Sequence, residues 1–351
     1  MNRLASPCVG VTALCCAALA PAGDPPITLE SLRAEHAAHA AALRTLIVEE
    51  DVQTRLAAGG LEARVRERLE DRLEAQRQRF YEAVDCSEDS AEALLLAEQR
   101  FDAAHDAHQV EGRLAAFAAN ARQSSRQRAA FDFVAQRVRI EQRDLRDLDA
   151  LAERFAVPAR ERVNLDCTRT VISTAGYSLL VNRDESLATV STGSTRPLTE
   201  RLVLLGIVPE RLLDGRYPTR VTREADGSIL LRAQRPDMDG LAFEIVLRPD
   251  EGRYATRITR YDRAGARLHE LHAADYRRLA PGMSAPFFTE TFERLSGQAG
   301  VRSVSRTVTR VQVNPDAPAA LFEAPRTARV QPLDASARAA YVSRDRGAQP
   351  K

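Results

Sequence analysis

Apolar and polar residues alternate in one short run after another from about residue 128 onward. Runs such as SLATVST, LAFEIVLR and VRSVSRTVTRVQV are rich in Val, Ile, Thr and aromatic residues, which suit strands with one buried face. Turn-forming residues separate the runs, as at Asp226-Gly227, 249–252 and Ala264-Gly265. Many short strands with few helices between them predict an antiparallel meander in a curled sheet, an open half-barrel.

One helical segment interrupts this pattern between Pro197 and Leu213. Its sequence TERLVLLGIVPERLL predicts an amphipathic helix that ends at Gly206, followed by a second turn of helix after Pro209. This segment is expected to provide helical cover for the sheet.

The part of the chain before the strands, from about residue 28 to 118, predicts helices. Ala, Leu, Glu, Gln and Arg dominate it, and proline is absent after Pro26. Thr28 can cap a first helix that ends at Gly59-Gly60. Its expected apolar face consists of Leu29, Leu32, Leu43, Leu46 and Leu56. Later apolar positions drift instead of holding a heptad, which favours a short antiparallel bundle or hairpin over a long coiled coil.

The expected fold class is therefore α+β, with an N-terminal helical bundle or hairpin followed by a curled antiparallel sheet. The expected organisation is a signal peptide at 1–22, a helical module at 23–120, the half-barrel at 121–326 and a disordered tail at 327–351.

The first residues resemble an export signal. Arg3 precedes an uncharged run from Leu4 to Ala20, and Ala20-Pro21-Ala22 forms an A-x-A cleavage site. Neither Cys15 nor Cys16 has a leucine three residues before it, so a lipoprotein anchor is disfavoured. We expect a periplasmic or secreted protein with no stable membrane anchor after cleavage.

Charge and motifs argue against several classes of function. Lys and Arg number 50 against 49 Asp and Glu, a net charge of +1, and tryptophan is absent, so nucleic-acid binding is not expected. The best basic patch is the stripe of Arg302, Arg306 and Arg310, which we interpret as an exposed strand face. Nucleophile and phosphate-loop motifs are missing, and the one lysine is Lys351, so the protein is not expected to be an enzyme. A hydrolase that uses two carboxylates stays open.

Histidine and cysteine give no metal or cofactor motif. His36 and His39, His105 and His108, and His269 and His272 are each three residues apart. The middle pair lacks a third strong ligand, so all six are interpreted as solvated or locally capped. After signal cleavage Cys86 and Cys167 remain, and they are either a disulfide or two separate thiols.

The segment from about 128 to 326 resembles the periplasmic lipoprotein-carrier family typified by LolA and its relative RseB. Three stretches carry the likeness: FDFVAQRVRIEQ with the strands at 163–192, the strand-turn-strand run at 257–288, and the closing strand with its ending NPDAPAALFEAP. The resemblance implies an open half-barrel, covered by helices, whose apolar concave face accepts acyl chains or another apolar partner.

An apolar cavity in a sheet too open to fill its own mouth agrees with a binding or carrier protein for a lipid, lipoprotein or other apolar ligand. The candidate lining residues are those that alternate on strands, and ordinary core packing is the favoured interpretation of each: Phe133, Tyr177, Phe243, Ile245 and Phe288. The alternative is a cell-envelope interaction or sensor protein that contacts an envelope partner through its helical module.

Overall fold

The computed structural model describes most of the sheet-forming part of the chain. The described residues are 27–58, 118–157, 162–163, 165–181, 187–236, 240–250, 252–294, 300–323 and 328–332, with short pieces between 66 and 116. The expected signal peptide and most of the segment from 59 to 113 lie outside them.

All strands of the described residues belong to one sheet of 14 strands. The strands are β1 (Thr45–Ala58), β2 (Arg122–Asp132), β3 (Arg137–Asp144), β4 (Arg169–Ser173), β5 (Tyr177–Val181), β6 (Leu187–Thr192), β7 (Thr219–Arg223), β8 (Ile229–Gln234), β9 (Leu241–Leu247), β10 (Ala255–Tyr261), β11 (Arg267–Ala280), β12 (Met283–Arg294), β13 (Gly300–Val313) and β14 (Arg329–Pro332). The described helices are α1 (Leu29–Ala42), α5 (Leu148–Arg154), α6 (Arg196–Leu204), α7 (Glu210–Leu213) and the 3-10 helix η2 (Ala319–Phe322).

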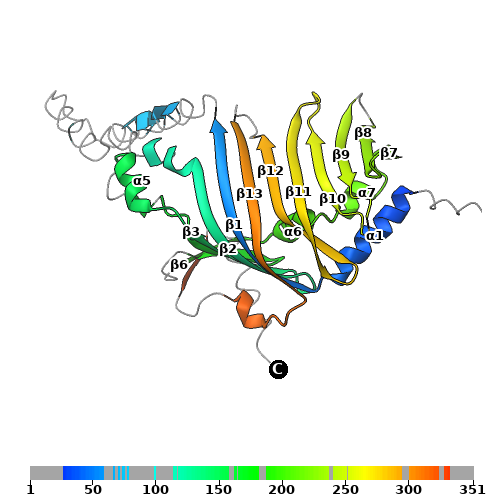
Figure 1. Cartoon of the computed structure of the whole chain (residues 1–351). Helices are drawn as coiled ribbons and strands as arrows, with labels where there is room; N and C mark the ends of the chain where they lie inside the picture. Colours follow the sequence, from blue (N-terminus) through cyan, green and yellow to red (C-terminus); the bar gives the residue numbers. More distant parts are fainter. Residues whose placement is uncertain are drawn as a thin grey trace, which may run out of the picture.

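The chain builds the sheet as two meanders that share a central strand. From β1 it passes outward through β2, β3, β4 and β5 to β6, crosses through α6 and α7 to the far edge at β7, and returns strand by strand to β13, which pairs with β1. The strands curl as they run, and α6 lies behind them near the middle of the sheet (Figure 1). The predicted α+β class and curled antiparallel sheet are confirmed.

The central strand corrects one prediction. Residues 45–58 were expected to continue the first helix, but they form β1. The leucine spacing that suggests a helix also fits a strand, because Leu46, Val48, Glu50 and Val52 are two apart and all are buried. The β-branched residues of this segment favour the strand. The helix prediction holds for α1, which begins at its Thr28 capping box, and short pieces between 66 and 120 are helical.

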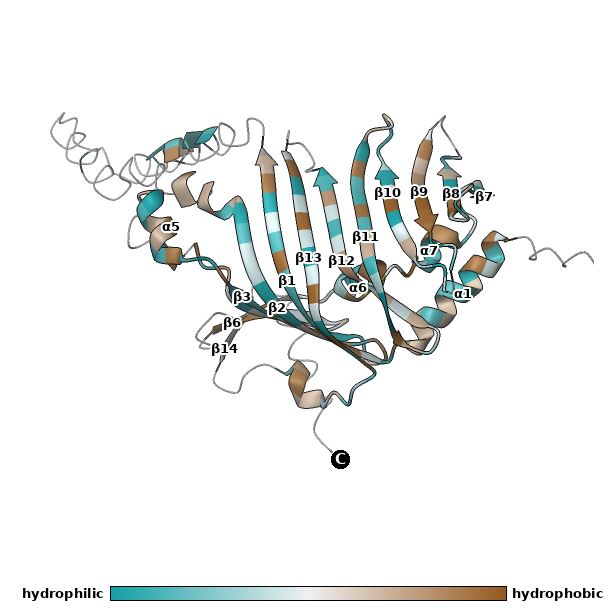
Figure 2. Cartoon of the chain, in the orientation of Figure 1, coloured by the Kyte–Doolittle hydropathy of each residue, from teal (hydrophilic) through white to brown (hydrophobic). Residues whose placement is uncertain are grey.

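The two faces of the sheet differ in what covers them. We call inner the face that carries Leu46, Val48 and Glu50, and outer the opposite face. The alternation shows as bands of hydropathy along β1, β13 and β11 (Figure 2). One apolar cluster on the inner face joins β8, β9 and β10 to α1 and α7, and another joins β1, β2 and β3 to α6. Helices therefore close the inner face of both meanders.

The turn between α6 and α7 is fixed to the sheet. Gly206 has φ +79°, and a Cβ on it would lie 2.4 Å from the Tyr276 hydroxyl oxygen. The Ala255 N–H donates to the Gly206 carbonyl oxygen (2.8 Å), and the Tyr276 hydroxyl donates to the Ala255 carbonyl oxygen (2.6 Å). The predicted helix end at Gly206 and second turn after Pro209 are confirmed, and only glycine fits this close approach.

The expected disorder from residue 327 is wrong for a short piece of the tail. Arg329–Pro332 forms β14, which pairs in parallel with β6 at the edge of the sheet. Ala328 packs against an apolar cluster that contains Ile172 and Leu179. The segment gains order because it pairs with an open strand edge, which composition does not reveal.

A buried ion pair fixes the end of the sheet near α5. The Asp144 and Arg146 side chains, 3% and 8% exposed, pair at 2.6 Å. Arg146 also donates to the carbonyl oxygens of Ala119, Arg122 and Leu165. Burial alone would raise the pKa of Asp144, but the hydrogen bonds from Arg146 and from the backbone of residue 167 lower that pKa to about 2.

We expect Arg146→Ala to lower the free energy of unfolding by about 3–5 kcal/mol, because it leaves the Asp144 carboxylate buried and three carbonyls without their donor. Urea unfolding of the whole chain measures this. Arg143→Ala, at an exposed position of β3 next to Asp144, is the control and should change stability by less than about 0.5 kcal/mol. Equal effects of the two variants would contradict the structural role of Arg146.

Candidate functional site

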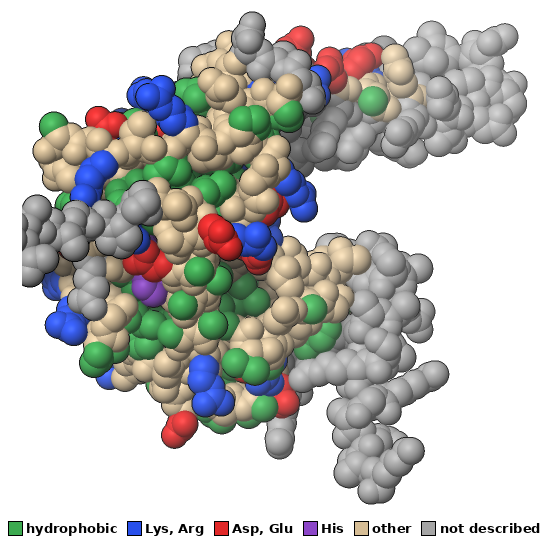
Figure 3. Space-filling view, turned by 90° about the vertical axis from the view of Figure 1, so that its right-hand side faces the viewer, with side chains coloured by type: hydrophobic (Ala, Val, Ile, Leu, Met, Phe, Trp, Pro, Cys, Tyr) green, Lys and Arg blue, Asp and Glu red, His purple; other side chains and the backbone are tan. Residues whose placement is uncertain are grey.

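A pocket lies between α6 and the inner face at the centre of the sheet. It is lined mainly by aliphatic side chains from β1, β12, β13 and α6: Leu46, Val48, Glu50, Arg201, Leu204, Leu205, Ala285, Pro286, Phe287, Thr289, Val308 and Val311. Its free space is about 10 Å³, room for about one water molecule. In Figure 3 hydrophobic side chains gather in the hollow of the molecule, beside acidic and basic ones. Helix α6 thus fills most of the space over the apolar face at this point.

A buried ion pair holds α6 to the sheet at this pocket. Arg201 of α6 donates from Nη1 and Nη2 to the two carboxylate oxygens of Glu50 on β1, at 3.0 and 2.8 Å. The side chains are 8% and 1% exposed, and the Arg201 guanidinium also lies 4.9 Å from the centre of the Phe131 ring. A bidentate pair in an apolar setting is strong and directional. It sets both the position and the rotation of α6.

A second arginine reaches the same carboxylate. Arg306 of β13 places Nε 3.8 Å from Oε1 of Glu50, and its side chain is 22% exposed. Burial would raise the pKa of Glu50, but the two guanidinium groups lower it. Burial and the nearby charges of Arg201 and Arg302 lower the pKa of Arg306. Two cations therefore share one buried anion.

The arginine stripe predicted as one exposed strand face is divided by a bulge. Val308 pairs with Glu50 and Arg310 with Glu49, so Thr309 is the extra residue on β13. Arg306 consequently lies on the inner face, while the exposed Arg310 lies on the outer face. The prediction is wrong for Arg306, because alternation alone cannot show where a strand gains a residue.

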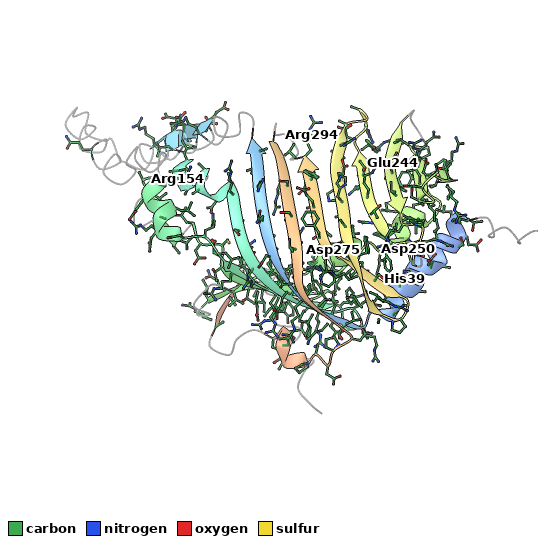
Figure 4. All side chains as sticks on the ribbon, viewed as in Figure 1. His39, Arg154, Glu244, Asp250, Asp275 and Arg294 are labelled. Atoms are coloured by element: carbon green, nitrogen blue, oxygen red, sulfur yellow. The ribbon has the colours of Figure 1, made fainter. Side chains whose placement is uncertain are left out.

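Helix α1 covers the other part of the inner face through buried residues. Leu32 is fully buried, and the Val208 N–H donates to Nδ1 of His36 at 3.3 Å. His39 stacks on Tyr254 with 4.8 Å between ring centres. His36 is 1% exposed, so its interpretation as solvated or locally capped is wrong, and burial lowers its pKa to about 4. His39 and Arg154 of α5 lie at opposite ends of the molecule (Figure 4).

The five predicted lining residues are not brought together. Phe243 and Ile245 share the inner face beneath α1 and α7, and Phe133 packs at the edge of the cluster beneath α6. Tyr177 belongs to the cluster on the opposite face, and Phe288 is 37% exposed on the outer face. The pocket is lined instead by Phe287, one residue before Phe288. A shift of one residue moves a strand side chain to the other face.

The remaining candidate groups give no second site. Cys167 forms no disulfide with a described residue, while Cys86, His105 and His108 lie outside the described part of the chain. Among described residues, no group of three or more His, Cys, Asp or Glu side chains could hold a metal ion. None of the described helices is both long and apolar enough to cross a membrane.

The fold and pocket define a curled-sheet protein whose apolar inner face is closed by short helices. No family model and no curated protein matches the chain. Among solved structures, the chain is similar to a putative outer membrane lipoprotein-sorting protein domain from Vibrio parahaemolyticus, with 9% identity, a TM-score of 0.41, and coverage of 84% of this chain and 97% of that one. It is also similar to a LolA superfamily protein from Nitrosomonas europaea, with 11% identity, a TM-score of 0.38, and coverage of 85% and 98%. Both names match the family that the sequence at 128–326 resembles.

Because two arginines surround one glutamate, removing the glutamate should destabilise the protein more than removing one arginine. Glu50→Gln leaves both guanidinium groups buried without their anion and should lower the free energy of unfolding by about 3–5 kcal/mol. Arg201→Gln should cost less, because Arg306 is near enough to pair with Glu50. Urea unfolding compares the two, with Glu49→Gln on the outer face as the control. A larger cost for Arg201→Gln would contradict the shared arrangement.

Proposed function

We propose that the protein binds and carries an apolar ligand, a lipid or the acyl part of a lipoprotein, on its inner face beneath α6. The observation that carries this proposal is the pocket between α6 and the sheet, where aliphatic side chains of three strands face a helix of nine residues. An acyl chain can bind such an apolar surface in place of the contacts that a short helix makes with it.

Binding requires α6 to move, because the closed pocket holds only about 10 Å³ of free space. A buried methylene contributes about 0.8 kcal/mol, so roughly a dozen methylenes of an acyl chain supply on the order of 10 kcal/mol. Breaking a buried ion pair such as that of Glu50 and Arg201 costs about 3–5 kcal/mol. The burial of a long acyl chain can therefore offset the cost of breaking this ion pair, whereas that of a much shorter chain cannot.

The carrier function is proposed as non-catalytic and located in the periplasm or outside the cell. The location rests on the export-signal pattern of residues 1–22, and the carrier role rests on the pocket. The alternative, an envelope interaction or sensor protein that acts through the helical module, depends on residues that mostly lie outside the described part and stays a prediction.

Neighbouring phenylalanines on β12 provide a matched test. Phe287→Asp places a charge in the pocket and should weaken binding of a neutral fluorescent probe such as N-phenyl-1-naphthylamine by about tenfold or more, because the carboxylate must be desolvated on binding. Phe288→Asp introduces the same charge on the outer face and should bind like the parent protein. Probe titration with circular dichroism as the folding check measures both. Equal binding by both variants would contradict the proposed site.

Native mass spectrometry identifies what the protein carries. The mature protein is purified from a periplasmic fraction, and anything that co-purifies is extracted and analysed. A lipid or acylated peptide in stoichiometric amount supports the carrier function. A clean apoprotein that also fails to bind fatty-acid probes would contradict it.

A further inference from the structure

The buried cluster of Glu50, Arg201 and Arg306 carries more positive charge than is needed to hold α6 to the sheet. Both carboxylate oxygens of Glu50 already accept from Arg201, at 2.8 and 3.0 Å. Arg306 lies 3.8 Å from the same carboxylate, close enough for an ion pair but too far for a hydrogen bond. Nη1 of Arg306 and Nε of Arg201 are buried and have no hydrogen-bond partner. Buried cationic donors without acceptors are costly, so their retention calls for an explanation.

The other charged groups around Arg306 do not supply the missing anion. Arg302, four residues away along β13, adds a third positive charge, and it is exposed. Glu200 of α6 is the remaining nearby acid, and it pairs with Arg196 at 2.6 Å. The surroundings of Arg306 therefore keep a net positive charge at the margin of an apolar pocket.

We propose that Arg306, together with Arg201, receives the oxyanion head of the ligand, so that the ligand is an anionic amphiphile with a carboxylate or phosphate group. This inference rests on the proposed carrier function and names the chemical class of its ligand. A guanidinium group binds both oxyanions in the same way, through charged hydrogen bonds.

The register of the strands places the site for the ligand's oxyanion head next to the apolar pocket for its alkyl tail. Arg306 pairs with Thr289, which lines the pocket, and Val308 lies two residues further along the same face of β13. A ligand whose oxyanion binds Arg306 would thus have its alkyl chain directed along the apolar lining of Val48, Val308 and Phe287. The ligand would lie between a shifted α6 and the apolar surface, and its oxyanion would supply an acceptor for Arg201 and Arg306.

Competition against the neutral probe N-phenyl-1-naphthylamine tests the inference on the full chain. The competitors are oleate, oleoyl lysophosphatidate, oleyl alcohol and inorganic phosphate. We expect at least one of the two anionic lipids to compete about tenfold or more better than oleyl alcohol, because hydrogen bonds to charged groups are strong in a partly buried site. Which of the two competes better identifies the head as a carboxylate or a phosphate.

Arg306→Gln should abolish the preference for the anionic lipids, measured as the ratio of their competition to that of oleyl alcohol. Arg310→Gln, an exposed arginine of the same strand on the outer face, should keep the preference. Thermal unfolding provides a second measurement: Arg306→Gln should not lower Tm of the ligand-free protein, because it removes an unmatched charge. A lowered Tm with the preference intact would identify Arg306 as structural and overturn the inference.

The outcomes separate this inference from the proposed function. Equal binding of oleate, oleoyl lysophosphatidate and oleyl alcohol would overturn the oxyanion site and leave the carrier function standing. If inorganic phosphate displaces the probe as effectively as the lipids do, the site binds small anions. That result would overturn the inference that the ligand is an anionic amphiphile. Failure of the probe itself to bind would overturn the carrier function together with the inference.

Discussion

The pairing of β1 with both β2 and β13 is the interaction on which the rest of the structure depends. It joins two meanders that would otherwise be separate sheets, and it spans almost the whole strand on both sides. The same strand places Leu46, Val48 and Glu50 on the inner face. Without β1, the pocket would lose one wall and Arg201 would lose the carboxylate that orients α6. The N-terminal part of the chain therefore organises a site whose other walls come from β12 and β13.

Local patterns predicted much of the sheet and its helical cover, because strand alternation, turn residues and the glycine after α6 act over a few residues. They failed at β1, where leucines at mixed spacing fit either a helix or a strand. Tertiary pairing decides that case, since β1 has two partner strands more than 60 residues away in sequence. They failed again at β14, whose order comes from the open edge of β6.

The site was harder to predict than the fold. Glu50 and Arg201 are 151 residues apart, and each is one of many acids and arginines in a charged sequence. The bulge at Thr309 decides that Arg306 faces inward, and one position separates the pocket residue Phe287 from the exposed Phe288. Apolar residues that alternate on strands were a sound guide to the core, as Phe243 and Ile245 demonstrate, but not to the pocket. A strand pattern predicts that one face is buried, whereas a pocket depends on which helix covers that face.

The most direct test of a ligand site beneath α6 is photo-crosslinking of a diazirine-bearing fatty acid to the full chain, followed by peptide mapping. We expect the labels to concentrate on the inner face beneath α6, at Leu46 and Val48 of β1, Phe287 of β12 and Leu204 of α6. We also expect unlabelled oleate to prevent this labelling. Labels that concentrate on outer-face residues such as Phe288, or labelling that oleate does not prevent, would contradict the claim that α6 covers the ligand site.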